Sequence, residues 1–305
     1  MIKMKMNCVS GFYFDTINTI QALCDKTILK AAFSRCKYYE KLLSRFERDS
    51  DVSRINHAQG MPVTVSDETV CILKLALYYH EISGGAFNPT LGVVSSTWKQ
   101  CLSEDRTPEE QTIRQMLLRV TFSETEINGN RVMLPAGLQL DLGGIAKGYI
   151  EDRIADELRE AGVQNALLNF GGNILSVGGH PRGDAWSIGL KTPFGTDKEC
   201  WAIAACRDSA ISTSGVYERG KTINNIRYHH ILDPETGFPV KNGIYAVSVF
   251  TEKAVDADAL STAFFVAGVE KGAHLLKKQD ALFACLMEDG SLVKSPELRL
   301  DMGRE

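Results

Sequence analysis

The clearest alternation of hydrophobic and polar residues lies in the middle of the chain. Residues 138–142 (LQLDL) alternate leucine with polar residues, the period-two pattern of a half-buried strand. A glycine pair at 143–144 follows, and from 146 to 158 apolar residues recur at every fourth position through a charged segment, which predicts an amphipathic helix. Gly162 is placed to end that helix. The pattern therefore predicts a strand, a glycine turn and a helix whose first turn holds Lys147.

The first turn of this predicted helix has the features of an anion site. Backbone N–H groups at a helix N-terminus are unpaired, the helix dipole is positive there, and glycines let a phosphate approach closely. The alternative is a tight strand–helix turn with an exposed Lys147, because glycine–phosphate patterns produce many false positives. This segment alone leaves both interpretations open.

Similar patterns predict elements on both sides of the central segment. Asp25 can cap a helix with an apolar face from Leu29 to Phe46, and Ser66 can begin another that ends before the glycine pair at 84–85. Thr107 begins a third helix. Strands are predicted at 12–20, 166–177 (with a glycine bulge), 186–190, 201–205 and 244–250. We further expect a Ser/Asn-rich loop at 47–60, an irregular segment at 83–98, a polar turn at 211–217 and an apolar helix at 256–267.

Composition and charge exclude several classes of protein. The 305 residues are 44% hydrophobic and 24% charged, as in ordinary globular proteins, and the net charge of −4 argues against nucleic acid as a partner. No apolar run reaches the ~20 residues that span a bilayer, and the N-terminus lacks an apolar signal segment, so we expect a cytoplasmic protein without a membrane segment. The eight cysteines form no CxxC pair; we expect reduced thiols, with Cys36 and Cys71 on core faces.

Two further places carry residues capable of chemistry. Asp258 and Thr262 are four positions apart on a predicted helix, so both project from one face and can offer hard oxygens to Mg²⁺. Alternatively, Asp256 or Asp258 is only a helix cap and Thr262 bonds back to the helix. His230 can act as a base near neutral pH, although an isolated histidine is more often structural. No GxSxG, Walker A or HExxH pattern occurs.

Taken together, these segments resemble the ApbE-like flavin transferases. The segments that carry the resemblance, in family order, are SGGAFNPT, LDLGGIAKGY, STSGVY, HHILDPETG and DADALSTA, within residues 12–268. Members of that family bind FAD with Mg²⁺ and transfer FMN to a threonine hydroxyl of an acceptor flavoprotein, releasing AMP. The resemblance implies an α+β fold of mainly antiparallel sheets with packed helices, in which two lobes of one domain hold FAD between them.

The resemblance also assigns residues. It implies a single domain over 1–305, with an N-terminal strand and helix at 10–47, FAD loops at 46–98, a core at 138–268 and a C-terminal tail at 290–305. It places Mg²⁺ on the Gly144 carbonyl, Asp258 and Thr262, and makes His230 the base that takes the proton of the acceptor threonine. The implied FAD-contacting residues are Phe46, Asn56, Ala86, Phe87, Asn88, Asp141, Lys147 and Ile231.

The sequence departs from the family pattern at two of these positions. Asn88 replaces an aspartate, which removes a charge near the flavin, and Phe46 replaces a tyrosine or tryptophan, which removes a polar contact. Two alternatives to transfer remain at this point. One is hydrolysis of FAD to FMN and AMP, with water in place of the threonine, and the other is a flavin-binding protein without catalysis.

Overall fold

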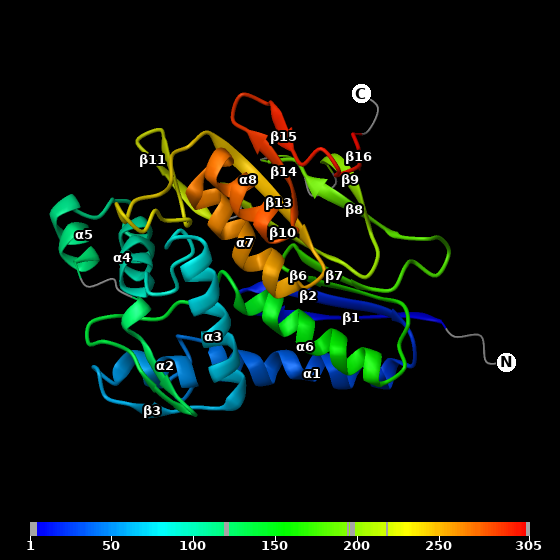
Figure 1. Cartoon of the computed structure of the whole chain (residues 1–305), viewed down its shortest axis with the longest axis horizontal. Coiled ribbons are helices and arrows are strands. Elements are labelled where there is room, and N and C mark those ends of the chain that lie inside the picture. The colour runs from blue at the N-terminus through cyan, green and yellow to red at the C-terminus, as the bar shows by residue number, and fades with distance from the viewer. Residues whose placement is uncertain (1–4, 119–121, 194, 196–198, 218, 303–305) are drawn as a thin grey trace.

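One antiparallel sheet organises the molecule. The computed structural model describes residues 5–302 apart from 119–121, 194, 196–198 and 218. The sheet has eight strands in the order β1-β2-β6-β7-β10-β13-β14-β15, and all neighbouring strands are antiparallel (Figure 1). These strands are β1 (Met6–Tyr13), β2 (Thr16–Leu23), β6 (Ala166–Phe170), β7 (Asn173–Val177), β10 (Ala210–Gly215), β13 (Ile244–Thr251), β14 (Leu282–Met287) and β15 (Leu292–Lys294).

Four helices pack on one face of this sheet and complete the largest core. They are α1 (Lys26–Leu43), α6 (Ala146–Glu160), α7 (Ala254–Ala267) and α8 (Val269–Lys278). Fully buried side chains of the helices, such as Leu29, Ile150 and Phe264, belong to the same hydrophobic cluster as Ile20 and Phe170 of the sheet. Burial of this apolar surface is the main favourable contribution to the fold, and it fixes α6 beside α7.

Smaller sheets and helices surround this framework. A three-stranded sheet covers part of the opposite face, where its side chains pack against Ile174 and Ile211; its strands are β8 (Trp186–Lys191), β9 (Cys200–Cys206) and β16 (Leu300–Asp301). The remaining strands are β3 (Val63–Thr64), β4 (Glu126–Asn128), β5 (Arg131–Met133), β11 (Gly220–Ile223) and β12 (Ile226–His229). The remaining helices are α2 (Asp51–His57), α3 (Asp67–Ile82), α4 (Gly92–Ser103), α5 (Glu110–Leu117) and the 3-10 turn η1 (Phe122–Glu124).

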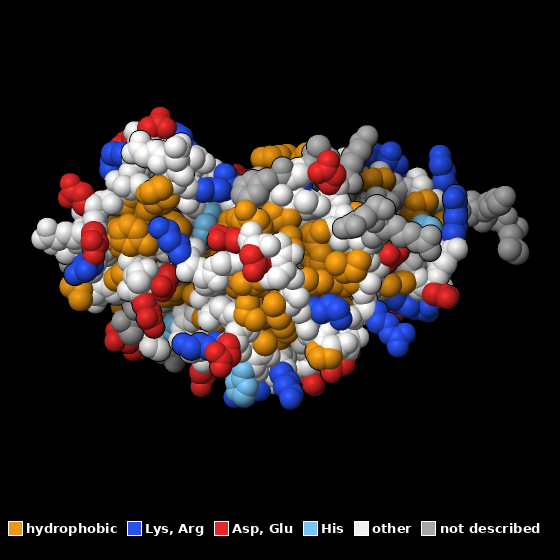
Figure 2. Space-filling model, turned by 90° about the horizontal axis from the view of Figure 1, so that it is seen from above, with side chains coloured by type: hydrophobic (Ala, Val, Ile, Leu, Met, Phe, Trp, Pro, Cys, Tyr) orange, Lys and Arg blue, Asp and Glu red, His pale blue; other side chains and the backbone are white. Residues whose placement is uncertain are grey.

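The upper surface of the molecule is mixed in character. Figure 2 shows hydrophobic side chains near the middle of this surface and charged side chains mainly around its rim. Among the described residues, no helix combines the length and apolar character needed to cross a bilayer.

The structure confirms the predicted α+β class and several helices. Asp25 accepts a hydrogen bond from the Thr27 N–H at the start of α1, and Ser66 caps α3 in the same way. The predicted amphipathic helix is α6, and Gly162 follows it with a φ of +80°. The apolar helix predicted from Asp256 begins two residues earlier, at Ala254, so Asp258 is not its cap.

Two strand predictions were wrong because tight turns divide the segments, and one turn prediction was wrong because its segment forms a strand. Residues 12–20 are the end of β1 and the start of β2, joined at Phe14 and Asp15, which both adopt positive φ. Residues 166–177 are two strands joined by the glycines at 171–172, not one strand with a bulge. The segment 211–217, predicted as a polar turn, contributes β10, a buried strand in which Ser and Thr follow no alternating pattern.

Other local predictions also need correction. Residues 138–142 alternate in burial as expected but form only one isolated bridge, from Gln139 to Leu91, and no strand. The predicted loop at 47–60 contains α2, capped by Ser50, and the irregular segment at 83–98 runs into α4. The helix predicted from Thr107 begins at Glu110 without a side-chain cap. All eight cysteines are free, but Cys71 is exposed because it lies on the outer side of α3.

Candidate active site

The glycine turn before α6 brings a carboxylate and a lysine to one place. Asp141 accepts a hydrogen bond from the Gly143 N–H at 3.0 Å, which closes a tight turn between the extended segment and the helix. Lys147, in the first turn of α6, donates to the Gly143 carbonyl at 3.3 Å. The residue before the helix, Ile145, provides no side-chain cap. The first turn therefore combines a positive dipole end with a lysine ammonium group.

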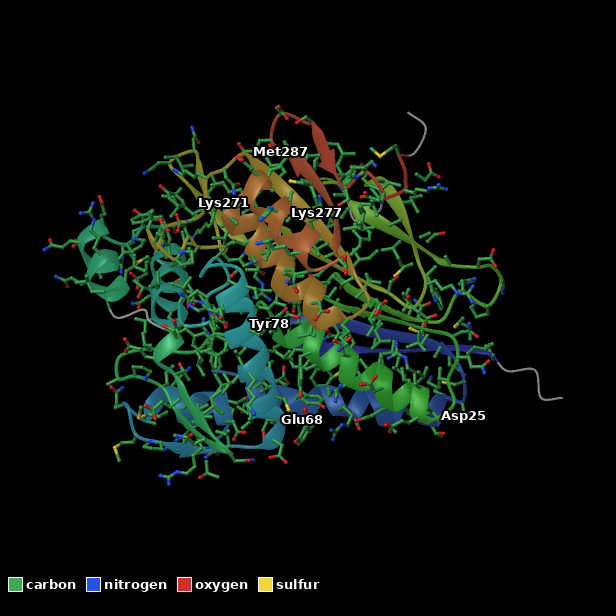
Figure 3. The ribbon with its side chains drawn as sticks, in the orientation of Figure 1. Asp25, Glu68, Tyr78, Lys271, Lys277 and Met287 are labelled. Atoms are coloured by element: carbon green, nitrogen blue, oxygen red, sulfur yellow. The ribbon has the colours of Figure 1, made fainter. Side chains whose placement is uncertain are left out.

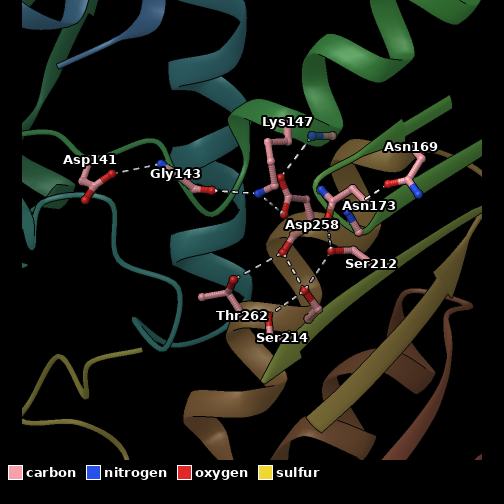
Figure 4. Close-up of polar contacts among 12 residues, drawn as sticks. Asp141, Gly143, Lys147, Asn169, Asn173, Ser212, Ser214, Asp258 and Thr262 are labelled. Carbon is pink, nitrogen blue, oxygen red and sulfur yellow. Dashed lines mark hydrogen bonds and ion pairs between the residues drawn. The ribbon is translucent and has the colours of Figure 1, made fainter. Parts of the chain in front are cut away.

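The same turn contacts α7 through Asp258. The Lys147 Nζ lies 3.5 Å from Oδ1 of Asp258, and the Gly148 N–H donates to Oδ2 at 3.0 Å. Figure 4 shows this series of contacts from Asp141 through Lys147 to Asp258. A Cβ on Gly148 would lie 2.2 Å from the Ala254 carbonyl oxygen, so only glycine permits this approach of α6 to α7. Asp258 is buried, yet an ammonium group and a backbone N–H satisfy its carboxylate.

Gly144 and Thr262 complete the cluster. A Cβ built on Gly144 would lie 3.3 Å from Oγ1 of Thr262 and 3.3 Å from Cε2 of Phe87. Thr262 lies one turn after Asp258, and its hydroxyl donates to the Asp258 carbonyl at 3.4 Å. The structure thus brings Gly144, Asp258 and Thr262 together, although 114 residues separate Gly144 from Asp258 in the sequence.

The donor set of this cluster fits Mg²⁺. It offers hard oxygen atoms from one carboxylate, one hydroxyl and one turn of backbone, and Mg²⁺ usually takes few protein ligands and completes its shell with phosphate and water. Within the described residues, nowhere do three or more His, Cys, Asp or Glu side chains gather as metal ligands. A cage built only from such side chains is therefore absent from that part of the chain.

A serine network that the sequence did not predict supports Asp258 from the sheet. Ser261 donates to the Asp258 carbonyl at 3.0 Å and also contacts the hydroxyls of Ser212 and Ser214 on β10 at 3.3 and 3.0 Å. Ser212 in turn donates to Asn173 of β7 at 2.8 Å. The segment STSGVY contains both β10 serines and is the available signal in the sequence, although its small polar residues predict a turn.

The loop 83–90 lies beside Gly144. Phe87 is buried, contacts the Tyr79 ring and accepts a hydrogen bond on its carbonyl oxygen from His80 at 2.9 Å. The Asn88 side-chain oxygen accepts hydrogen bonds from the N–H and the hydroxyl of Thr90, at 2.9 and 2.7 Å. These acceptor contacts need no charge, so asparagine can replace aspartate here without loss of the turn. Ala86 is half-buried next to Phe87.

Arg45 and Phe46 follow α1 near Asp141. The Arg45 guanidinium lies 3.3 Å from Oδ2 of Asp141, and Ser95 donates to the same oxygen at 3.1 Å. Phe46 lies beyond the end of the helix with 64% of its surface exposed, between the cations of Arg45 and Lys99, each 4.8 Å from the ring centroid. An exposed ring held by two cations can stack on a flat ligand.

Asn56 contributes from behind the central segment. Its side-chain amide donates to the Leu140 carbonyl at 3.0 Å and accepts from the Leu140 N–H at 2.7 Å. The side chain is buried, and both of its polar atoms bond to this backbone. Asn56 therefore fixes the segment that ends in Asp141.

His230 lies just after β12, with Ile231 beside it. His230 is exposed at the surface, and its backbone N–H and its Nδ1 both lie 3.2 Å from the Arg219 carbonyl. The surrounding chain partly desolvates the ring and lowers the pKa of His230 below its ordinary value, and the positive charges of Arg219, His229 and Lys147 act in the same direction. The imidazole is therefore neutral at pH 7. Ile231 is buried.

The fold and this site define an α+β protein in which a helix N-terminus, a lysine and a buried carboxylate converge where a cation and a phosphate group can be held. Residues 14–287 match the model of the ApbE family, and the chain belongs to that family. It is thus a member of an enzyme family of FAD:protein FMN transferases.

Similar proteins support this assignment along most of the chain. The FAD:protein FMN transferase of Treponema pallidum (strain Nichols) is 37% identical over 275 residues, which cover 84% of this chain and 76% of the relative. That of Klebsiella pneumoniae (strain 342) is 35% identical over 289 residues, or 92% of this chain and 90% of the relative. The crystal structure of the ApbE protein of Thermotoga maritima has a TM-score of 0.88 at 30% identity and covers 96% of this chain and 97% of its own.

Proposed function

We propose that this protein transfers FMN from FAD to a threonine hydroxyl of an acceptor flavoprotein, with Mg²⁺ as the required ion and AMP as the second product. The observation that carries the proposal is the contact of Gly144, Lys147, Asp258 and Thr262 at the junction of α6 and α7. Family membership supports FAD as the substrate and a protein as the acceptor.

In this proposal Mg²⁺ is held by the Gly144 carbonyl, an Asp258 carboxylate oxygen and the Thr262 hydroxyl. An ion bound there would neutralise negative charge on the pyrophosphate oxygens. Lys147 adds a second positive charge at the same place, and the N-terminus of α6 adds the partial charge of its dipole. Phosphoryl transfer depends mainly on such placement and charge stabilisation.

The remaining predicted residues form the walls around FAD. Phe46 offers an exposed ring, while the loop residues Ala86, Phe87 and Asn88 lie beside Gly144. Asp141 presents its carboxylate between Arg45 and the glycine turn. Asn56 holds this wall from behind, and Ile231 is a buried neighbour of His230.

His230 acts as the base in the proposed step. The threonine oxygen forms a bond to the phosphorus of the FMN moiety, the bond from that phosphorus to the oxygen of AMP breaks, and the hydroxyl proton moves to the neutral imidazole. The lowered pKa of His230 keeps the ring unprotonated and available at neutral pH.

We also propose a cytoplasmic location, since eight free cysteines suit a reducing compartment.

The test is incubation with FAD, Mg²⁺ and a co-encoded flavoprotein, followed by mass spectrometry of the acceptor and chromatography of nucleotides. We expect one FMN on a threonine and an equal amount of AMP. Free AMP without acceptor would favour hydrolysis, and stoichiometric FAD without AMP under any metal condition would favour a binding protein.

Asp258→Asn should abolish Mg²⁺-dependent turnover, whereas Asp156→Asn, on the exposed side of α6, should retain it.

A further inference from the structure

Asp152 of α6 caps a helix that lies 102 residues further along the chain. Its Oδ1 accepts a hydrogen bond from the Ala254 N–H at 2.8 Å, and its Oδ2 accepts one from the Val255 N–H at 3.0 Å. These are the first two residues of α7, whose own N-cap residue, Lys253, forms no side-chain cap. A carboxylate at a helix N-terminus satisfies unpaired N–H groups and complements the dipole.

A second contact joins the same helices one turn away. Gly148 lies one turn before Asp152 on α6, and its N–H donates to Oδ2 of Asp258, which lies one turn after Ala254 on α7. The two helices thus exchange hydrogen bonds in both directions: α6 accepts at Asp152 and donates at Gly148. The close fit of Gly148 against the Ala254 carbonyl leaves little freedom between these two points.

Simple packing does not account for Asp152. Burial raises the pKa of Asp152 to about 6, and the negative charges of Asp256 and Asp156 act in the same direction. The hydrogen bonds from the N–H groups of Val255 and Ala254 lower the pKa but do not offset this. A carboxylate in such a place is unfavourable by itself, and residues of this kind concentrate at functional sites.

We propose that Asp152 is a positioning residue: by fixing the first turn of α7 on α6, it keeps Asp258 and Thr262 opposite Gly144 and Lys147. The proposal rests on the cation site proposed above. Residues that orient metal ligands from behind typically change metal affinity by about 10–100-fold when replaced. Asp152 touches neither FAD nor acceptor in this role and acts through α7 alone.

The test combines two measurements that do not depend on turnover. Mn²⁺ affinity is measured by electron paramagnetic resonance, and hydrogen exchange is followed in peptides that cover 252–262. In Asp152→Asn and Asp152→Ser we expect faster exchange at the start of α7 and at least about tenfold weaker Mn²⁺ binding. The concentration of Mg²⁺ for half-maximal transfer should rise by the same factor, while kcat at saturating Mg²⁺ changes less.

Two control variants separate positioning from general destabilisation. Asp25→Ala removes the cap of α1 at the lower right of the molecule (Figure 3), and Asp156→Asn removes an exposed charge one turn after Asp152. Neither should alter Mn²⁺ affinity.

The outcomes keep the two proposals distinguishable. If wild-type protein binds Mn²⁺ and Asp152→Asn binds it equally well, the positioning role is wrong while the proposed function stands. Equal weakening in Asp25→Ala would also overturn the positioning role, because any lost cap would then have the same effect. If wild-type protein binds no Mn²⁺ at all, the proposed cation site is wrong, and the positioning role fails with it.

Discussion

Glu151 is fully buried on α6, and neither of its carboxyl oxygens makes a hydrogen bond of ordinary geometry within the described residues. Burial raises its pKa well above the usual range, and the negative charges of Asp258 and Asp152 raise it further. The folded protein therefore retains a proton on Glu151 that the unfolded chain releases near pH 4.5. The stability that this proton provides is complete below that pH and is lost as the pH rises.

Glu151→Met should therefore stabilise the protein at high pH. Replacement of buried ion pairs by apolar side chains of similar volume is often neutral or stabilising by about 1–4 kcal/mol, and a buried carboxyl without a hydrogen bond gives even less reason to expect a loss. We expect the free energy of unfolding in urea to exceed that of wild type by about 1–3 kcal/mol at pH 8, and by less at pH 5. An equal difference at both pH values would show that Glu151 does not carry the proton.

His230 permits a prediction about the pH dependence of transfer. Its pKa lies below the ordinary 6.5, so the neutral base is lost only when the pH falls well below 6. We expect kcat/KM for FMN transfer to stay level from pH 8 to 6 and to decline towards pH 4. His230→Gln should lower the rate about 10²–10⁴-fold while FAD binding persists. An acidic limb centred at 6.5 or above would contradict the lowered pKa of His230, and an unchanged rate in His230→Gln would contradict its role as the base.

At the scale of the elements, the contact of α6 with α7 depends on Gly148. Helix propensity alone favours alanine over glycine by about 1 kcal/mol. A Cβ at 148 would, however, lie 2.2 Å from a backbone oxygen of Ala254, and overpacking of this kind costs about 1–3 kcal/mol or more. Gly148→Ala should therefore lower the free energy of unfolding and weaken cation binding.

Gly183→Ala provides the matched control for this variant. A Cβ there would meet nothing within 4 Å, so we expect a change within about 0.5 kcal/mol in the urea unfolding that measures both variants. If Gly148→Ala proved as stable as Gly183→Ala, the helices would have room to separate, and the close contact would not constrain the site.

The helices were more predictable than the strands for local reasons. Asp25 and Ser66 are caps that act within three residues, and the apolar stripe of α6 has a helical period, so both signals are visible in the sequence. The two hairpins were not predicted as such, because Phe14 and Asp15 adopt positive φ without glycine and because Gly171-Gly172 resembles a bulge. The buried strand β10 shows no alternation that marks it as a strand.

At the scale of the whole molecule, the site unites segments that are distant in the sequence. Motif resemblance named Gly144, Asp258 and Thr262, and the fold brings them together. Spacing could not reveal Asp152 or the β10 serines as supports of α7, since their contacts depend on how α6 packs on α7 and on the register of the sheet. Such tertiary relations lie beyond local patterns.

Ligands that bind a site of this kind should stabilise the entire fold. A ligand at 100 times its Kd stabilises by about 2.7 kcal/mol, which raises Tm by several degrees in a chain of this size. We expect FAD with Mg²⁺ to raise Tm more than the sum of either alone, as measured by calorimetry. In Asp258→Asn we expect only the rise in Tm that FAD gives alone. If FAD with Mg²⁺ raised the Tm of this variant as much as that of wild type, the cation site would be wrong.

Trp98 of α4 has a consequence for experiment. Its indole N–H donates to the Gly237 carbonyl at 2.7 Å, and its ring stacks on Tyr228 of β12 with centroids 5.5 Å apart. The segment that carries His230 is therefore attached to α4 through a fluorophore. Emission from Trp98, isolated by replacing Trp186 and Trp201 with phenylalanine, should report optically whether this segment leaves α4 when an acceptor docks.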